Sequence, residues 1–525
     1  MSASARAGED GQAEVLRFLA DPATHAGAVP RRIDTHGSVV FLAGDRALKL
    51  KRAVAFSYMD FSTPGRRAAL CRAEVEANRR MAAPIYLGVL AVARRGGALA
   101  LVPDDEARDD EAVDHVVAMR RFPEGGEFDA LAAAGRLDAP LVRRLAAVVA
   151  RFHAAAEPMP GFGGAAGLAE VAAENAREFA REAPLLDPAL AARAGALCAR
   201  ALERIGPLLD ARAAAGRVRR CHGDLHLGNV CLFEGAPMPF DAIEFNPAIA
   251  NVDTLFDLAF LLMDLELRCS RALSSACLNA YLEVLPETDG LAALPAMMAL
   301  RAGIRAHTRA AASRAQPDEA RRTAIAADAR RHLAAIEAFL EARPPRLVAV
   351  GGLSGTGKST LARGLAPDLH AAPGAVVLRS DALRKELAGV PPEEKLGAGH
   401  YTPARSRLVY DTLLGRAAAI LRAGRSVVLD AVFQREEERD AAAAIARDAG
   451  CRFDGLWLEA DRETAAARIA QRRDDASDAT AGVLDQQLAR DAGAPARWRA
   501  VDARGEPSQV LARARVAMSP WVHRG

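Results

Sequence analysis

The feature that most constrains this chain is a glycine-rich octapeptide, Gly352-Leu353-Ser354-Gly355-Thr356-Gly357-Lys358-Ser359. In the pattern G-x-x-x-x-G-K-[ST], backbone N–H groups curl round an anion, the lysine reaches the outer phosphates and the hydroxyl reaches a magnesium ion. An apolar run at 346–350 precedes the loop, and a helix-like stretch at 359–366 follows it, so that the N-terminus of a helix faces the phosphates. We predict that residues 352–360, including Thr360, bind ATP and that Ser359 is a metal ligand.

A second set of phosphate chemistry lies about 130 positions earlier, where the chain reads His222-Gly223-Asp224 and continues to Asn229. In a kinase catalytic loop an Asp accepts the proton of the acceptor hydroxyl, and an Asn five residues later holds a metal ion. A metal-binding Asp is then expected across a short hairpin, and Asp241 follows the apolar stretches 230–233 and 238–240. We predict that Asp224, Asn229 and Asp241 are catalytic and that Asn229 and Asp241 bind metal.

With glycine at 223, this pattern resembles the aminoglycoside phosphotransferase and choline kinase branch of the kinase-like fold more than protein kinases. The sequence from Asp253 to Ala259 is similar to the D-x-x-x-D-L-A helix start of the same branch. The resemblance implies a bilobal kinase-like domain that transfers a phosphoryl group to a small molecule. The chain lacks a G-x-G-x-x-G loop over the phosphates, which departs from protein kinases.

Lysine is rare in this chain, since only five of 69 basic residues are lysine. Two of them, Lys49 and Lys51, lie on one face of a predicted strand at 46–52, which forms a hairpin with 38–42. A small-lobe lysine of a kinase contacts the α- and β-phosphates and is oriented by a helix glutamate. We favour Lys49 with Glu74 for these ATP-binding roles, and Lys51 and Glu76 stay open as alternatives.

The segment after the glycine-rich loop resembles phosphate-loop small-molecule and polynucleotide kinases such as gluconate kinase, chloramphenicol phosphotransferase and zeta toxin. Asp381 and Asp430 follow predicted strands, at the sheet edge where open α/β sheets bind ligands. The resemblance makes Asp381 the acceptor-side catalytic base and Asp430 a magnesium-site residue. Arg468, Arg472 and Arg473 occupy the lid position, where guanidinium groups can contact ATP, although a solvated basic helix is the alternative.

A length of 525 residues suggests two or three domains, and Pro344-Pro345 provides the best boundary. We predict a bilobal kinase-like domain at 1–343, with a small lobe at about 25–121 and a large lobe at about 127–343. A phosphate-loop domain with a doubly wound parallel sheet, and therefore an α/β fold, should occupy 346–525. Its expected strands are 346–351, 375–379, 426–430, 453–458 and 497–501; in the small lobe 98–102 and 114–122 are expected to pair.

The composition indicates an ordinary globular protein, with 51% hydrophobic and 26% charged residues and a net charge of +2. Seven cysteines without a C-x-x-C pair favour reduced thiols and a cytoplasmic location. Neither a membrane span nor nucleic-acid binding is favoured, although a nucleic-acid end stays open as an acceptor for the phosphate-loop domain at 346–525.

As a whole the chain resembles bacterial two-domain proteins with an aminoglycoside-phosphotransferase-like domain fused to a P-loop kinase domain of the AAA-family type. This resemblance implies that ATP and Mg²⁺ are cofactors and that a small-molecule hydroxyl is the acceptor. The alternative is that only the P-loop domain is an active kinase or ATPase, and that the N-terminal domain is a nucleotide-dependent regulatory or substrate-binding module.

Overall fold

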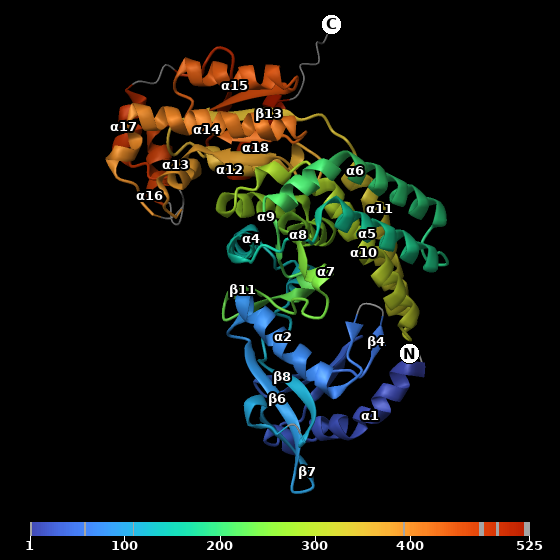
Figure 1. Ribbon diagram of the computed structural model, residues 1–525. Coiled ribbons are helices and arrows are strands. Elements are labelled where there is room, and N and C mark those ends of the chain that lie inside the picture. The colour runs from blue at the N-terminus through green and yellow to red at the C-terminus, as the bar shows by residue number, and fades with distance from the viewer. Residues whose placement is uncertain are drawn as a thin grey trace. The chain divides into compact units, whose positions relative to one another are not determined.

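The computed structural model describes residues 3–56, 59–108, 110–391, 394–471, 477–489 and 493–518 (Figure 1). By their internal contacts the residues divide into two compact units. The first, here called the front unit, comprises Met1–Cys269 and Met297–Ile336, and the second, the rear unit, comprises Ser270–Ala296 and Glu337–Gly525. Residues 270–296 therefore group with the phosphate-loop sequence, whereas the domain boundary near Pro344 stays a prediction.

The small lobe of the front unit is a six-stranded antiparallel sheet in the order β1-β2-β3-β8-β6-β7. Its strands are β1 (Arg31–Asp34), β2 (Ser38–Ala43), β3 (Arg46–Lys51), β6 (Tyr86–Arg95), β7 (Ala98–Pro103) and β8 (Ala112–Arg120). The pairing expected between 98–102 and 114–122 is wrong, because β7 pairs with β6 and β8 lies between β3 and β6. The tight turn at Gly96-Gly97 makes β6 and β7 a hairpin, and sequence reasoning had overlooked β6.

The two faces of this sheet explain why β3 carries both leucines and lysines. Leu48 and Leu50 point into a core that is shared with β2 and with Val15 and Leu19 of helix α1 (Ala3–Ala20). Side chains alternate along a strand, so Lys49 and Lys51 face the opposite side. Helix α2 (Pro64–Ala82) lies on that side, begins at an N-cap by Thr63, and packs against β8 and β6.

The rest of the front unit is mostly helical, and its central helix α8 (Thr254–Arg268) is buried from Thr254 to Leu265. Two short sheets hold the loops beside it, one of β10 (Val230–Phe233) and β11 (Ala236–Pro239), the other of β9 (Val218–Arg220) and β12 (Asn251–Asp253). The other helices are α3 (Phe128–Ala133), α4 (Ala139–Ala155), α5 (Gly164–Arg181), α6 (Pro188–Ala214), α7 (Pro247–Ala250), α10 (Leu294–Ala315) and α11 (Glu319–Leu340), the last two crossing the unit boundary at their ends.

The rear unit contains a parallel five-stranded sheet in the order β14-β15-β13-β16-β17. The strands are β13 (Arg346–Gly352), β14 (Val376–Arg379), β15 (Val427–Asp430), β16 (Arg452–Glu459) and β17 (Arg499–Asp502), at the five places expected from the sequence. The predicted α/β fold class is thereby confirmed for this unit.

Helices cover both faces of the parallel sheet, as the doubly wound arrangement requires. Helices α12 (Lys358–Leu365) and α18 (Pro507–Met518) pack together on one face and share a core with β13, whereas α14 (Pro403–Arg422) and α15 (Glu436–Asp448) pack together on the other face (Figure 1). The unit also contains α9 (Arg271–Val284), α13 (Ser380–Ala388), α16 (Arg462–Ala470) and α17 (Ala481–Leu488). Among the described residues, no helix has both the length and the apolar character that a bilayer crossing demands.

Candidate active sites

The front site is built around Lys49 of β3, whose ammonium group contacts two carboxylates. Its Nζ lies 2.8 Å from Glu74 Oε1 on α2 and 2.5 Å from Asp241 Oδ1 in the loop after β11. Three residues separated by up to 192 positions in the chain are thus in direct contact. Glu76, the alternative glutamate, lies on the exposed side of α2.

Lys51, the alternative lysine, forms a second ion pair behind the first. Its Nζ lies 2.6 Å from Glu74 Oε2 and also bonds Glu244, which sequence reasoning did not single out. Each carboxylate oxygen of Glu74 therefore accepts a hydrogen bond from one of the two lysines, and the side chain of Glu74 is fully buried. Of the two lysines, only Lys49 contacts both Glu74 and Asp241.

Electrostatic compensation keeps these buried groups charged. Burial opposes ionisation of Glu74, but attraction by Lys49 and Lys51 outweighs it and lowers the pKa of Glu74 to about 2. Burial likewise opposes the charge of Lys49, and attraction by Asp241 and Glu74 still holds its pKa well above the ordinary value. Glu74 and Lys49 are consequently ionised at neutral pH.

The loop 222–229 places the other predicted residues next to one another. Asn229 Nδ2 donates to Asp224 Oδ2 at 2.9 Å and to the Asp224 carbonyl at 3.0 Å. His226 Nε2 lies 3.4 Å from Asp224 Oδ2. Burial opposes ionisation of Asp224, but attraction by His226 and Arg305 leaves its pKa well below the usual value, so it is a carboxylate at neutral pH.

Two aspartates on α8 accept hydrogen bonds from the backbone of this loop and hold it in place. The N–H groups of His222 and Gly223 donate to Asp257 at 3.1 and 2.9 Å, and that of Leu227 donates to Asp264 at 3.0 Å. Asp257 and Asp264 are two helical turns apart, which places them on one face of α8. His153 Nε2 lies 3.1 Å from Asp257 and completes the support as a buried partner rather than a separate site.

The geometry also explains why glycine stands at 223, where protein kinases have arginine. Its φ is +84°, in the left-handed region, and an added Cβ would lie 2.9 Å from the carbonyl oxygen of Ile249. A larger residue would therefore strain the backbone and collide with the backbone of α7. Asp241 also has a positive φ, of 63°, which Asp tolerates better than most residues.

The rear site lies at the carboxyl ends of β13, β14 and β15, where the loop 352–357 leads into α12. Gly355 has a φ of +82°, and a Cβ at that position would lie 2.3 Å from the carbonyl oxygen of Ala465. Gly357, which precedes α12, has a φ of +93°. These two positions require glycine, because the loop must curl tightly to direct its N–H groups inward.

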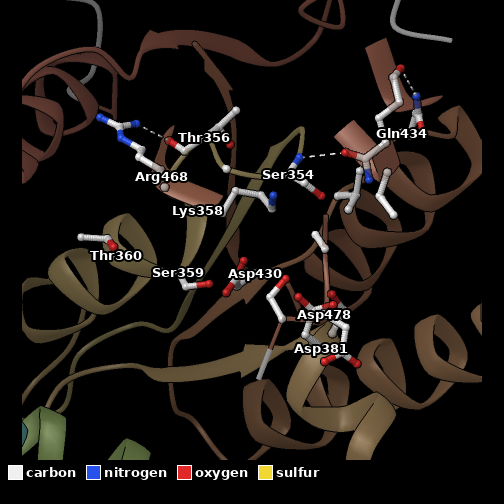
Figure 2. A pocket seen from close by; sticks show the side chains of 18 of the residues that line it. Ser354, Thr356, Lys358, Ser359, Thr360, Asp381, Asp430, Gln434, Arg468 and Asp478 are labelled. Atoms are coloured by element: carbon white, nitrogen blue, oxygen red, sulfur yellow. Dashed lines mark hydrogen bonds between the residues drawn. The ribbon is translucent and has the colours of Figure 1, made fainter. Parts of the chain in front are cut away.

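A pocket of about 1050 Å³ opens beside this loop and contains most of the predicted rear-site residues (Figure 2). It is lined by Ser354 to Leu361, Asp381, Asp430 and Arg468. Gly352, the last residue of β13, and Leu353 after it do not line the pocket. Lys358 Nζ donates to the carbonyl of Leu353 at 2.9 Å, so the lysine is folded back over the loop. This volume exceeds that of a typical drug-sized pocket and can hold a nucleotide with a second small molecule.

The predicted magnesium ligands of the rear site share a basic neighbour, Arg379 at the end of β14. Arg379 Nε lies 3.3 Å from Asp430 Oδ2, and its Nη2 lies 3.4 Å from Ser359 Oγ. The carboxylate and hydroxyl oxygens, which face one another in Figure 2, are ligands that Mg²⁺ prefers. Because they already attract a positive group, this pair fits a divalent cation.

The opposite end of the pocket contains Asp381, at the start of α13, and a network that the sequence did not reveal (Figure 2). Asp478 accepts a hydrogen bond from Tyr401 Oη at 2.7 Å and another from the Leu396 N–H at 3.0 Å. Lys385 Nζ lies 3.1 Å from Asp478 Oδ1. Burial opposes ionisation of Asp478, but these donors lower its pKa, so it ties two segments beside the pocket together as a carboxylate.

Arg468 is the one predicted lid arginine within the described residues, since Arg472 and Arg473 lie outside them. It belongs to α16, and its guanidinium donates to the carbonyls of Thr356, Ala503 and Gly505 at 3.3, 2.9 and 3.2 Å. In this arrangement Arg468 supports the glycine-rich loop from the side.

Sequence reasoning overlooked Glu244, Asp478 and Arg379 for different reasons. Glu244 lies three residues after Asp241, so its proximity to a predicted site residue was an available signal. Arg379 directly precedes Ser380-Asp381, but arginine is so abundant in this chain that a single arginine carries little signal. Asp478 lies in a stretch with no recognisable motif, and only the fold brings it to the pocket.

Comparison with known families matches each unit to a separate group. A model of the phosphotransferase enzyme family matches residues 42–243, and a model of the AAA domain matches residues 347–492. Among solved structures, the chain is similar to a gluconokinase from Sinorhizobium meliloti 1021, with 22% identity over 33% of this chain and 93% of that chain (TM-score 0.25). It is also similar to a choline/ethanolamine kinase family protein from Mesorhizobium loti, with 16% identity over 62% of this chain and 99% of that chain (TM-score 0.36).

Relatives of nearly full length occur in mycobacteria. An uncharacterized protein of Mycobacterium tuberculosis is 32% identical over 474 residues, which are 87% of this chain and 89% of the relative, and a protein of Mycobacterium bovis matches to the same extent. Both predicted domain types are thus confirmed, and they support phosphotransferase activity in general. The chain belongs to the family of these mycobacterial proteins, and in this chain a phosphotransferase-family domain is followed by a P-loop kinase domain of the AAA type.

Proposed function

We propose that this protein is an ATP- and Mg²⁺-dependent kinase with two phosphotransfer sites, each of which passes the γ-phosphoryl group of ATP to a hydroxyl of a small molecule. The observation that carries the proposal is the contact of Lys49 with both Glu74 and Asp241 beside the Asp224–Asn229 pair. These are the parts that kinase chemistry requires for phosphate binding, metal binding and activation of the acceptor.

At the front site, Asp224 orients the acceptor hydroxyl and takes its proton. Its low pKa keeps it in the carboxylate form that this role needs. Asn229 and Asp241 would hold magnesium, which neutralises charge on the phosphates, and Lys49 would bind the phosphates themselves. Glu74 keeps the lysine in place by its two ion pairs with β3.

At the rear site, the N–H groups of the glycine-rich loop and Lys358 bind the phosphates of ATP. Ser359 and Asp430 would hold the metal, and Asp381 would act as base for the acceptor hydroxyl. Asp381 and Lys358 line the same pocket, which gives the acceptor a place beside the nucleotide.

A small-molecule acceptor in the cytoplasm is the partner that we propose for both sites. All seven cysteines are free thiols, in keeping with a reducing compartment. The nearly balanced charge gives no electrostatic basis for nucleic-acid binding, and an oligonucleotide acceptor would require salt-sensitive association.

Formation of ADP by two single variants and their combination tests the proposal. Lys358→Ala should leave extract-dependent ADP formation at the front site when a bacterial small-molecule extract is supplied, and adding Asp224→Asn should abolish it. Lys395→Ala and Asp110→Asn make the same chemical changes at exposed positions and serve as controls. If Lys358→Ala is inactive while Asp224→Asn retains full activity, the front unit is a regulatory or substrate-binding module.

A further inference from the structure

Helix α9 belongs to the rear unit, although in the chain it lies between α8 and α10, which lie mostly in the front unit. It begins at Ser270, whose hydroxyl accepts from the Leu273 N–H, and most of its residues from Ser274 to Leu282 are buried. The short turn η4 (Thr288–Gly290) that follows α9 packs against α14. The rear unit thus includes a segment that lies about 60 residues before its glycine-rich loop.

Asn279 of α9 serves as a hydrogen-bond partner for the edge strand of the parallel sheet. Its Nδ2 donates to the carbonyl of Ala375 at 3.2 Å, and its Oδ1 accepts from the Val377 N–H at 2.7 Å. Strand β14 is at the edge of the sheet, and within the described residues no strand pairs with it on that side. The side-chain amide of Asn279 bonds the carbonyl of Ala375 and the N–H of Val377 on this open edge. These two hydrogen bonds hold α9 at a defined register on β14.

One helical turn after Asn279, Glu283 lies beside Arg379, the residue that contacts both predicted metal ligands. Glu283 Oε1 is 3.6 Å from Arg379 Nη1 and 3.7 Å from Arg363 Nη2 on α12. Arg379 is 5% exposed, so its charge must be balanced within the protein. Its guanidinium is therefore placed between Asp430 and Ser359 on one side and Glu283 on the other.

We propose that Glu283 is a positioning residue of the rear site, which takes over the charge of Arg379 when a divalent cation binds Asp430 and Ser359. This inference rests on the function proposed for that site. A cation and a guanidinium repel one another if both face the same carboxylate, and the repulsion is strong where water is scarce. Glu283 offers the guanidinium a second carboxylate without requiring it to leave its buried position.

The distances favour such an exchange. Glu283 lies within ion-pair range of both arginines but beyond the usual length of a charge-assisted hydrogen bond, 2.7–2.9 Å. The contacts of Arg379 with Asp430 and Ser359, at 3.3 and 3.4 Å, are also long. The guanidinium is thus shared between the two sides, and a small rotation toward Glu283 would exchange one set of contacts for the other.

Isothermal titration of Mg²⁺ into the full-length protein, with a non-hydrolysable ATP analogue present, measures the Mg²⁺ affinity that Glu283 is proposed to support. The Lys358→Ala variant provides the blank for binding at the front site. Glu283→Gln should raise the Mg²⁺ concentration for half-saturation of the rear site about tenfold, the usual scale for loss of a group that supports metal ligands. Affinity for the analogue in EDTA should stay within about twofold, since the phosphate-binding loop is unchanged.

Asn279→Ala separates positioning from simple docking of the helix, because it removes the hydrogen bonds to β14 without changing charge. It should lower the unfolding midpoint and leave the Mg²⁺ dependence close to that of the wild type. Adding Arg379→Gln to Glu283→Gln should restore Mg²⁺ affinity, since no guanidinium then competes for Asp430. Because the double variant leaves no unbalanced guanidinium in the core, it can be measured even if Glu283→Gln alone folds poorly.

The inference fails if Glu283→Gln leaves the Mg²⁺ dependence unchanged, or if Asn279→Ala reproduces the loss. It also fails if Arg379→Gln does not restore affinity in the Glu283→Gln background. A wild-type protein with the same nucleotide binding as Lys358→Ala would instead contradict the function proposed for the rear site. The two failures are therefore distinguishable in one series of titrations.

Discussion

The two candidate sites compensate their charges in different ways. In the front site, Lys49, Lys51, Glu74 and Glu244 neutralise one another as side chains, three of them with at most 5% exposure. In the rear site, Lys358 bonds a backbone carbonyl, and the carboxylate of Asp381 lines a pocket of about 1050 Å³. Lys49 and its partners thus belong to the folded core, whereas Lys358 and Asp381 line an open pocket. The rear site also contains the buried ion pair of Arg379 and Asp430.

This difference predicts where stability and activity are coupled. Removal of one member of a buried ion network leaves an uncompensated charge and destabilises the fold. Removal of a group that lines an open pocket leaves water to replace it, so activity falls while stability changes little. Substitutions at the two sites therefore test whether stability and activity are coupled at one site and separate at the other.

The largest effect on stability is expected from Glu74→Gln. The change leaves Lys49 and Lys51 facing a neutral amide in a fully buried position and should destabilise the protein by about 3 kcal/mol. Asp381→Asn in the rear site should change stability by less than about 0.5 kcal/mol. Urea unfolding of both variants provides the measurement, and equal losses of stability would contradict the proposed difference between the sites.

A backbone change should give the next largest effect, and in the rear unit. Gly355→Ala places a Cβ against the carbonyl of Ala465 in a left-handed conformation and should cost about 2 kcal/mol together with loss of nucleotide binding. Gly415→Ala, in the middle of α14 with nothing within 4 Å of the added atom, should instead stabilise the unit by about 1 kcal/mol. Thermal unfolding with and without nucleotide would show whether the signs are opposite.

The pH dependence of stability provides a smaller effect. The pKa of Glu74 is lowered from 4.5 to about 2, so its contribution is complete above pH 4.5 and is lost as the pH falls toward 2. In that window the wild type should lose up to about 1.4 kcal/mol per pH unit more than Glu74→Gln. Parallel unfolding curves of the two proteins between pH 4.5 and 3.5 would mean that Glu74 is not held ionised.

The smallest effect is expected at an exposed ion pair beside the rear site. Arg462 and Asp485 contact one another at 2.7 Å, but both side chains are about half exposed. Solvent and salt screen such a pair, so Arg462→Ala should leave the midpoint of urea unfolding unchanged. A clear shift of the midpoint would show that α16 and α17 depend on this contact.

Motif and spacing were enough to predict most of the residues that the structure brings together in both candidate sites. The octapeptide at 352–359, with a strand before it and a helix after it, predicted a parallel sheet whose five strands lie where they were expected. The interval between Asp224 and Asn229 predicted their proximity, because five residues span a single loop. Local rules succeed here because phosphate binding depends on consecutive backbone N–H groups and short loops.

Contacts between distant segments could not be predicted in the same way. Lys49 and Lys51 share a strand face, so periodicity could not distinguish them, and only the packing of α2 and the loop after β11 shows that Lys49 contacts Asp241. Strand β7 pairs with β6 across the turn at Gly96-Gly97, whereas the sequence pattern had suggested 114–122 as its partner.

The sequence by itself determined that this chain contains two motifs that predict phosphate binding, since each is encoded by residues close together in the chain. The tertiary structure decided which side chains complete them. Arg379, Glu283 and Asp478 come to the rear site from separate segments, one of which precedes the unit's own loop by about 60 residues. Such contacts depend on how helices and strands pack in three dimensions, and no local pattern of residues records them.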